Sequence, residues 1–193
     1  GVALPIFPKP SADFRLPITP SNLILIGPGT GIAPFMGFLR QKSSDSVGTA
    51  AQTGLWRGGF EIQEDEIPDE QIASSIDVFF GCRHRDHDWL YRQEMEEYQS
   101  DKLIRLHLAF SRDGDTDCRY VQDSIRKEKT MVLQLITAKQ AVVYLCGDGN
   151  KMAKDVQTTL VELLAEQFGE IDKATAYFKD MKKKRRFFMD IWM

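Results

Sequence analysis

The chain has 193 residues, of which 42% are hydrophobic and 27% are charged, a composition typical of one soluble globular domain. A formal net charge of −3 and a pI of about 5.7 argue against a nucleic-acid-binding surface, which needs a concentrated excess of Lys and Arg. No apolar run is long enough to span a membrane and no signal peptide is evident, so we expect no membrane contact from this chain. The three cysteines form no CxxC pair, which argues against a disulfide framework or zinc site and favours a reducing, cytoplasmic setting.

The first 20 residues are rich in proline and begin without an initiating Met. We interpret residues 1–20 as a linker or the tail of a preceding FAD-binding domain, and residues 21–193 as one domain. The chain is therefore expected to be part of a longer protein. That protein could carry an anchor in the endoplasmic reticulum membrane.

Short apolar runs predict strands, and segments with helical spacing lie between them. The predicted strands are residues 22–26, 76–81, 103–110, 141–146 and 187–192. The predicted helices are residues 32–41, 89–98, 120–128, 131–139, 152–168 and 174–185. Residues 43–75, rich in Ser, Gly, Asp and Glu, are predicted to be a long insertion. This alternation predicts an α/β fold with a five-stranded parallel sheet and helices on both faces.

A glycine-rich segment, Gly27-Pro28-Gly29-Thr30-Gly31, follows the first predicted strand and precedes a helix. Ligands of parallel α/β sheets bind where the strands end, so this position is a candidate site. Glycines let backbone amides approach a pyrophosphate, and the helix N-terminus favours its negative charge. The spacing departs from the fingerprint G-x-G-x-x-G, and a plain tight turn explains the segment, taken alone, equally well.

The next two strands end in basic residues. Arg83 stands where an NAD-binding domain usually has a carboxylate for the ribose hydroxyl, which argues against NAD. An alternative role for Arg83 is a surface ion pair with Asp86. The third strand ends in Ser111-Arg112, and a hydroxyl next to a forked guanidinium suits a phosphate monoester.

The fourth strand ends in Cys146-Gly147-Asp148, and the chain ends soon after Asp190 and Trp192. A lone buried cysteine is usually a small core residue. At the carboxyl end of a strand, before Gly-Asp, a functional role is favoured.

Three segments together resemble the NADP-binding domain of the ferredoxin–NADP reductase superfamily, particularly that of the diflavin reductases. They are Gly27–Phe35, Ser111-Arg112 with the following Arg119–Gln122, and Cys146–Asp148. The sequence around Gly81-Cys82-Arg83-His84 is most similar to the methionine synthase reductase branch. The resemblance covers residues 14–40 and 76–192 and does not explain the insertion.

The resemblance implies an NADP(H) site in which Ser111 and Arg112 bind the 2′-phosphate and Tyr120 offers a stacking face for adenine. The residues implied to bind this cofactor are Gly29, Thr30, Gly31, Arg83, Ser111, Arg112, Arg119, Tyr120, Gln122, Gly147, Asp148, Met152 and Asp155.

The resemblance also implies a catalytic group. Cys146 would lie beside the hydride-bearing carbon of nicotinamide, with Asp190 as its acidic partner. Trp192 would stack on FAD and would be the only residue of this chain to contact it. Hydride would pass from NADPH to FAD, and then electrons to FMN and a cobalamin or haem protein. The FAD-binding and FMN-binding domains would belong to the same longer chain, so this chain alone is expected to bind NADP(H) without transferring hydride.

Two other functions stay open at this point. One is a piece of a microsomal NADPH–haemoprotein reductase, which would use the same active site. The other is a non-catalytic, NADP-sensing domain.

Two polar clusters invite other interpretations. His84, Asp86, His87 and Asp88 supply too few suitably spaced ligands for a tetrahedral metal site, so no metal is predicted. The basic run 182–186 resembles a nuclear-import signal, but we interpret it as the solvated end of the last helix, where positive charge offsets the helix dipole.

Overall fold

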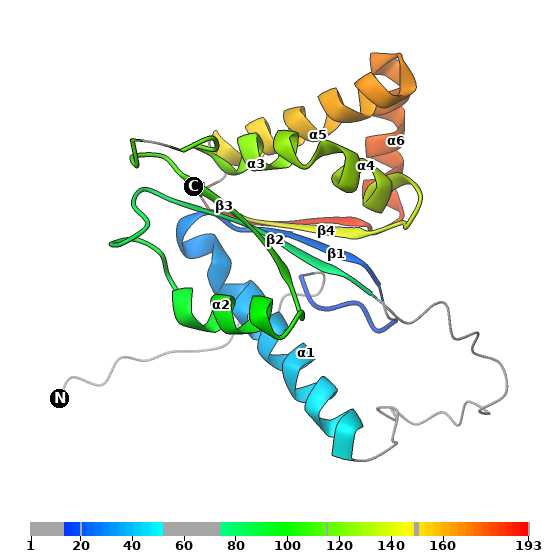
Figure 1. Cartoon of the computed structure of the whole chain (residues 1–193). Helices are drawn as coiled ribbons and strands as arrows, with labels where there is room; N and C mark the ends of the chain where they lie inside the picture. Colours follow the sequence, from blue (N-terminus) through cyan, green and yellow to red (C-terminus); the bar gives the residue numbers. More distant parts are fainter. Residues whose placement is uncertain (1–13, 20, 52–73, 115, 149–150, 193) are drawn as a thin grey trace, which may run out of the picture.

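The computed structural model describes residues 14–19, 21–51, 74–114, 116–148 and 151–192. Most of the predicted tail and residues 52–73 of the predicted insertion lie outside these ranges. The described residues form one sheet with helices packed on each of its two faces (Figure 1).

All strands of the sheet are parallel, as the sequence predicts. They are β1 (Leu23–Ile26), β2 (Ile76–Cys82), β3 (Arg105–Phe110), β4 (Val142–Asp148) and β5 (Phe187–Trp192). Their order in space is β3-β2-β1-β4-β5, so the chain builds outward from β1 on one side and then returns to build on the other. Every strand therefore ends at the same edge of the sheet, and the connections diverge between β1 and β4.

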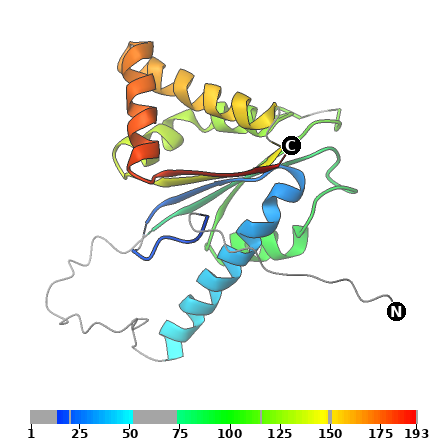
Figure 2. The same ribbon diagram turned by 180° about the vertical axis from the view of Figure 1, so that it is seen from behind.

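Helices cover both faces of the sheet (Figures 1 and 2). One face carries α3 (Val121–Lys127), α4 (Lys129–Thr137), α5 (Met152–Phe168) and α6 (Ile171–Lys183), and the other carries α1 (Ala33–Ala51) and α2 (Arg92–Ser100). Ile24 and Ile26 of β1 pack toward α3–α6, while Leu23 and Leu25 pack toward α1 and α2. A central strand buried on both faces explains why its sequence is continuously apolar rather than alternating.

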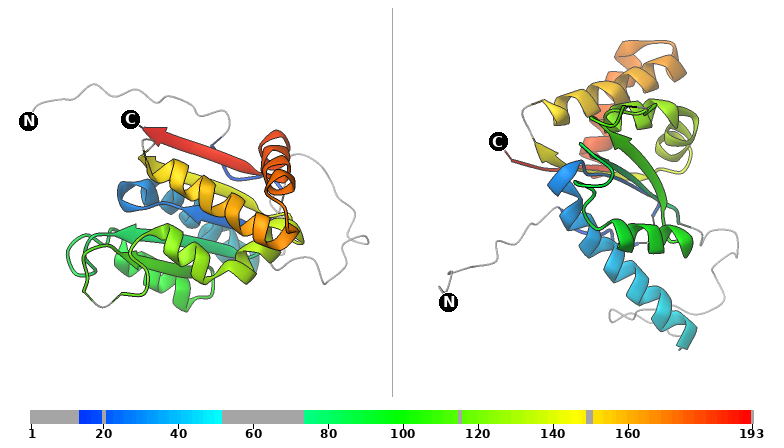
Figure 3. Two further views of the ribbon diagram at one scale, coloured as in Figure 1. Left: turned by 90° about the horizontal axis from the view of Figure 1, so that it is seen from above. Right: turned by 60° about the vertical axis from the view of Figure 1, so that its left-hand side comes forward.

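Helix α1 is longer than the sequence predicts. It continues past the predicted end near Gln41 to Ala51, through the first residues of the predicted insertion. The hydroxyl of Ser44 donates a hydrogen bond to the Arg40 carbonyl one turn earlier (2.9 Å), so this serine is accommodated inside the helix. As a result α1 projects beyond the other helix on its face (Figure 3).

Helix α2 begins three residues later than predicted, at Arg92. The preceding residue, Tyr91, has a φ of +56°, a left-handed conformation that cannot continue a helix. Trp89 therefore lies in the connection, where its ring packs near those of Phe80 and Phe110 at centroid distances of 6.4 and 5.7 Å.

A buried charge cluster fixes the edge strand β3 against β2. Asp77 is fully buried and accepts hydrogen bonds from Arg105 Nε (2.8 Å) and Nη2 (2.6 Å), and His107 Nε2 lies 3.0 Å from its Oδ1. The His107 ring also stacks on Phe79 at 4.4 Å. Burial by itself would raise the pKa of Asp77, but the bonds from His107 and Arg105 outweigh it and hold the pKa below its ordinary value.

We expect Arg105→Leu to lower the free energy of unfolding at pH 7 by about 2–3 kcal/mol, because it leaves a buried carboxylate without its main partner. Arg105 is 53% exposed, so the loss should be smaller than for a wholly buried pair. In the wild type, a depressed pKa means that this carboxylate contributes stability above the unfolded-state pKa and loses it as the pH falls through the lower, folded-state value. The penalty of the variant should therefore shrink on acidification.

Urea unfolding at pH 7 and at lower pH measures this penalty. Arg92→Leu is the matched control, because its partners Asp86 and Glu96 are exposed. A penalty no larger than that of the control would contradict the expected role of the cluster.

Candidate functional site

The turn that follows β1 touches the carboxyl end of β4 through its backbone. A short 3-10 turn, η1 (Gly29–Ile32), connects β1 to α1, where the sequence predicts only a loop. An ideal Cβ on Gly31 would lie 2.8 Å from the carbonyl carbon of Cys146 and 3.3 Å from the Cα of Gly147, so only glycine fits there. This contact places the N-terminus of α1 where the two halves of the sheet diverge, a position that favours an anion.

Cys146 and Asp190 are neighbours across β4 and β5, paired in register. The side chain of Cys146 is buried, and this burial, with a second contribution from the Asp190 carboxylate, raises the pKa of the Cys146 thiol to about 12. The thiol is therefore protonated at neutral pH and is no thiolate nucleophile. Gly147 follows with a φ of +148°, and an ideal Cβ there would lie 2.5 Å from Met152 Cε at the start of α5.

Strand β5 is an outer strand of the sheet and ends with exposed apolar side chains. Trp192 pairs in register with Asp148, and its side chain is 46% exposed. Its neighbour Ile191 is 42% exposed. A large exposed aromatic at the ligand-binding edge of a sheet is suited to contact a ligand or another domain.

Basic side chains gather where β2 and β3 end. Backbone N–H groups of Ser111 and Arg112 donate to the carbonyls of Cys82 and Arg83 (both 2.9 Å), so the two segments stay paired beyond the strands. Arg83, Arg112 and the nearby Arg119 are exposed. None of these three arginines forms an ion pair with a carboxylate in the part of the chain that the structure describes.

The alternative ion pair between Arg83 and Asp86 is not formed. Asp86 instead lies 3.6 Å from Arg92, measured from Oδ1 to Nη1. The guanidinium of Arg83 is thus left available to a ligand at this edge.

The start of α3 brings further predicted residues to the same edge. The carboxylate of Asp123 accepts hydrogen bonds from the backbone N–H groups of Arg119 (3.0 Å) and Tyr120 (2.9 Å), which fixes the start of this helix. The ring of Tyr120 is 61% exposed and free to stack. Gln122 Oε1 is buried and has no hydrogen-bond donor among the described residues, so a ligand could reach it only if the Gln122 side chain moved.

The predicted site residues thus form two groups at one edge of the sheet. The group near β1, β4 and β5 contains Gly29, Thr30, Gly31, Cys146, Gly147, Asp148, Met152, Asp190 and Trp192. The group near β2 and β3 contains Arg83, Ser111, Arg112, Arg119, Tyr120 and Gln122. Asp155 lies three residues after Met152 in the first turn of α5, half-buried.

Sequence reasoning missed two residues at this edge. The guanidinium of Arg85 lies over the ring of Phe110, 4.6 Å from its centroid, and adds another positive charge beside Ser111. Asp113 contacts the segment that follows Arg83. The short spacing between Arg83 and Arg85 could have indicated Arg85, whereas nothing in the sequence indicates a role for Asp113.

The polar side chains of residues 84–88 make hydrogen bonds that stabilise this part of the fold. His84 Nδ1 lies 3.2 Å from Asp113 Oδ1, and the backbone N–H of His84 donates to Asp88 Oδ2 (3.2 Å). Across the described ranges, no group of three or more His, Cys, Asp or Glu side chains could hold a metal ion.

The basic run at residues 182–186 lies at the end of α6 as predicted, and all of it except the half-buried Arg186 is exposed. Lys182 Nζ donates to Gln157 Oε1 (2.7 Å) and lies over two phenylalanine rings, and burial lowers its pKa. Arg186 Nη1 donates to the Ile136 carbonyl at the end of α4 (3.0 Å). Both ends of the run therefore hold α6 and β5 in place, which argues against an import signal.

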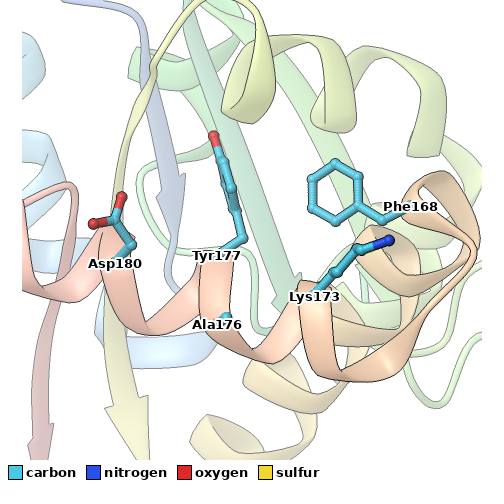
Figure 4. A pocket seen from close by; sticks show the side chains of 5 residues that line it. All are labelled: Phe168, Lys173, Ala176, Tyr177 and Asp180. Atoms are coloured by element: carbon cyan, nitrogen blue, oxygen red, sulfur yellow. The ribbon is translucent and has the colours of Figure 1, made fainter.

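A hollow of about 510 Å³ lies elsewhere, on α5 and α6 (Figure 4), lined by Phe168, Lys173, Ala176, Tyr177 and Asp180. Its polar groups are already paired: the Tyr177 hydroxyl donates to the Ile136 carbonyl (3.0 Å), and Lys173 pairs with Glu170. Phe168 is the last residue of α5, about 25 Å along that helix from its start at the sheet edge. The hollow is therefore separate from the candidate site.

The strand order, the glycine turn between β1 and α1 and the polar residues at the strand ends define a Rossmann-like nucleotide-binding domain. A family model described as the oxidoreductase NAD-binding domain matches residues 25–158, more than half of the chain. The chain belongs to this family.

Several curated relatives are similar over nearly the whole chain. It is 33% identical to methionine synthase reductase of Mus musculus, over 97% of this chain and 25% of that protein. It is 37% identical to NADPH–cytochrome P450 reductase of Salmo trutta (94% and 27%) and 36% identical to that of Mus musculus (98% and 25%). The predicted resemblance to NADPH-dependent diflavin reductases is confirmed, and both candidate members of the group appear among these relatives.

The chain spans about a quarter of the length of these relatives. Of the helices in the described ranges, none combines the length and the apolar character needed to cross a membrane.

Proposed function

We propose that this chain is the NADPH-binding module of a longer flavoprotein reductase that passes hydride from NADPH to FAD. The observation that carries the proposal is the group of exposed arginines around Ser111 where β2 and β3 end, which pair with no carboxylate of the described residues. An NAD site has a carboxylate at the end of β2, and this chain has Arg83. Two guanidinium groups and a hydroxyl suit the additional 2′-phosphate of NADP.

The residues at the sheet edge fit the whole cofactor. Gly31 lets the turn before α1 close against the end of β4, so the start of α1 lies beside the place where a nicotinamide and pyrophosphate would bind. The exposed Tyr120 ring suits an adenine, and Gln122 would bind the adenine after a change of its side-chain rotamer exposes its unsatisfied oxygen. Bound NADPH would supply the hydride. The Cys146 thiol would pack beside the nicotinamide. Because its pKa is about 12, the thiol stays protonated and would not attack the nicotinamide as a nucleophile.

In the longer protein, we propose that FAD-binding and FMN-binding domains of the same chain receive the electrons, with Trp192 as the residue of this chain that contacts FAD. The segment that leads from such a domain would be anchored on this one through residues 14–19: the Tyr144 hydroxyl donates to the Arg15 carbonyl (2.6 Å), and Phe14 contacts the Tyr144 ring edge-on.

The final acceptor is proposed to be a cobalamin protein, as the name methionine synthase reductase suggests, with a haem protein as the alternative. The location is proposed to be the cytoplasm, or the endoplasmic reticulum membrane if the longer protein carries an anchor.

Calorimetric titration of the chain with NADP and with NAD tests the proposal. We expect NADP to bind at least about tenfold more tightly, because the 2′-phosphate makes charge-assisted hydrogen bonds. At equal concentrations NADP should raise the melting temperature more than NAD does. Equal affinity for the two nucleotides would show that the residues at the ends of β2 and β3 do not form a 2′-phosphate site.

A further inference from the structure

One carboxylate ties together the segments that follow β2 and β3. Oδ1 of Asp113 lies 3.2 Å from His84 Nδ1, and Oδ2 accepts a hydrogen bond from the backbone N–H of Arg85 (3.2 Å). Asp113 directly follows Arg112, whose own N–H donates to the Arg83 carbonyl (2.9 Å). These three contacts, in addition to the hydrogen bond from the Ser111 N–H to the Cys82 carbonyl, join the backbone segments that carry Arg83 and Arg112.

The segment that Asp113 holds is itself a closed turn. The carboxylate of Asp88 accepts the N–H of His84 (3.2 Å), and the N–H of Asp88 donates to the carbonyl of His84 (3.0 Å). Arg85 is fixed at both ends, because its N–H binds Asp113 and its guanidinium lies over the Phe110 ring. Asp113 thus connects β3 to a pre-formed turn rather than to a loose loop.

Charge alone would disfavour an acidic residue here. A carboxylate close to a phosphate repels it, and the repulsion is stronger at a protein surface than in bulk water. Asp113 is only 29% exposed, and both of its oxygens are engaged by the 84–85 segment. The position of Asp113 next to Arg112 is explained if the arginine spacing that Asp113 fixes favours phosphate binding more than its negative charge disfavours it.

We propose that Asp113 is a positioning residue that holds Arg83, Arg85 and Arg112 at the spacing that recognises a 2′-phosphate. The inference rests on the proposed function. Asp113 does not touch the nucleotide; it acts through the backbone of the turn and through His84. Recognition of the phosphate then depends on an acidic residue, which is the opposite of what charge counting predicts.

The test compares Asp113→Ala with Asp113→Asn, using adenosine 2′,5′-bisphosphate and NADP against 5′-AMP and NAD. The alanine variant should bind the two 2′-phosphate ligands about tenfold more weakly, because the arginines lose their fixed spacing. Binding of 5′-AMP and NAD should not change. The asparagine variant keeps an oxygen for the Arg85 N–H and removes the repulsion, so it should bind NADP at least as tightly as the wild type does.

Asp117→Ala is the matched control, since it removes the same charge from the same connection. Asp117 is 85% exposed and pairs with Lys127 (3.0 Å), away from the 84–85 turn, so this variant should bind NADP like the wild type. NADP binding by Asp113→Ala that equals or exceeds the wild-type value would overturn the inference. A parallel loss of NADP and NAD binding would also overturn it, because it would indicate general damage to the fold. Both results leave the proposed function intact, whereas a wild type that does not prefer NADP would overturn that function.

Discussion

Gly31→Ala is expected to lower the free energy of unfolding by about 3 kcal/mol and to remove most of the affinity for NADP. The new Cβ would meet the main-chain carbonyl of Cys146 and the Cα of Gly147, and neither can move aside as a flexible side chain can. Relief requires η1 to separate from the end of β4. That separation would disrupt the contact between η1 and the backbone of Cys146 and Gly147.

Gly37→Ala is the control for this prediction. Gly37 lies in α1, and an ideal Cβ there has no atom within 4 Å. Because alanine favours a helix, this variant should be more stable than the wild type by about 0.5–1 kcal/mol. Urea unfolding and NADP titration of both variants provide the comparison. If Gly31→Ala behaves like Gly37→Ala, then η1 and the end of β4 are not packed as described.

The second large effect is expected from Ser111→Ala combined with Arg112→Ala. This double variant should lose about 100-fold in affinity for NADP, because each charge-assisted bond to a phosphate contributes about 1.5–3 kcal/mol. Its affinity for NAD should change little, since NAD has no phosphate at this position. The fold should be retained, because Arg112 is exposed and Ser111 is only half-buried.

Two further variants separate geometry from charge. Arg112→Lys keeps the charge but loses the forked pair of donors, so its affinity for NADP should be intermediate. Arg126→Ala removes a positive charge from the far end of α3, where Arg126 pairs with Glu162 (3.0 Å), and should leave NADP binding unchanged. Equal losses of NADP and NAD affinity in the double variant would argue against a role of these residues in choosing between the nucleotides.

Much of the fold follows from local pattern. The apolar runs that became β1, β2 and β4 are buried on both faces, and such runs can hardly be placed elsewhere than in a parallel sheet. Helix ends were harder to predict. Helix α6 starts at Ile171, before the predicted start at Ala174, because its first turn is exposed and lacks the apolar periodicity that marks the rest.

The candidate site likewise contains residues that the sequence predicts and contacts that it does not. Residues directly after strands could be predicted, since parallel strands bring their ends to one edge. The neighbours Cys146 and Asp190 depend on the register of β4 and β5, which the sequence alone does not specify. The contacts of Asp113 arise from turn geometry, and no periodicity or motif in the sequence predicts them.

The high pKa of Cys146 has a consequence for the chemical durability of the protein. With a pKa of about 12, Cys146 carries almost no sulfur anion at pH 7. The sulfur anion is the nucleophile that attacks peroxides and disulfides, so this cysteine resists conversion to sulfenic acid or to a mixed disulfide. The buried position of Cys146 in β4, next to β5, thus protects the sulfur from oxidation as well as from solvent.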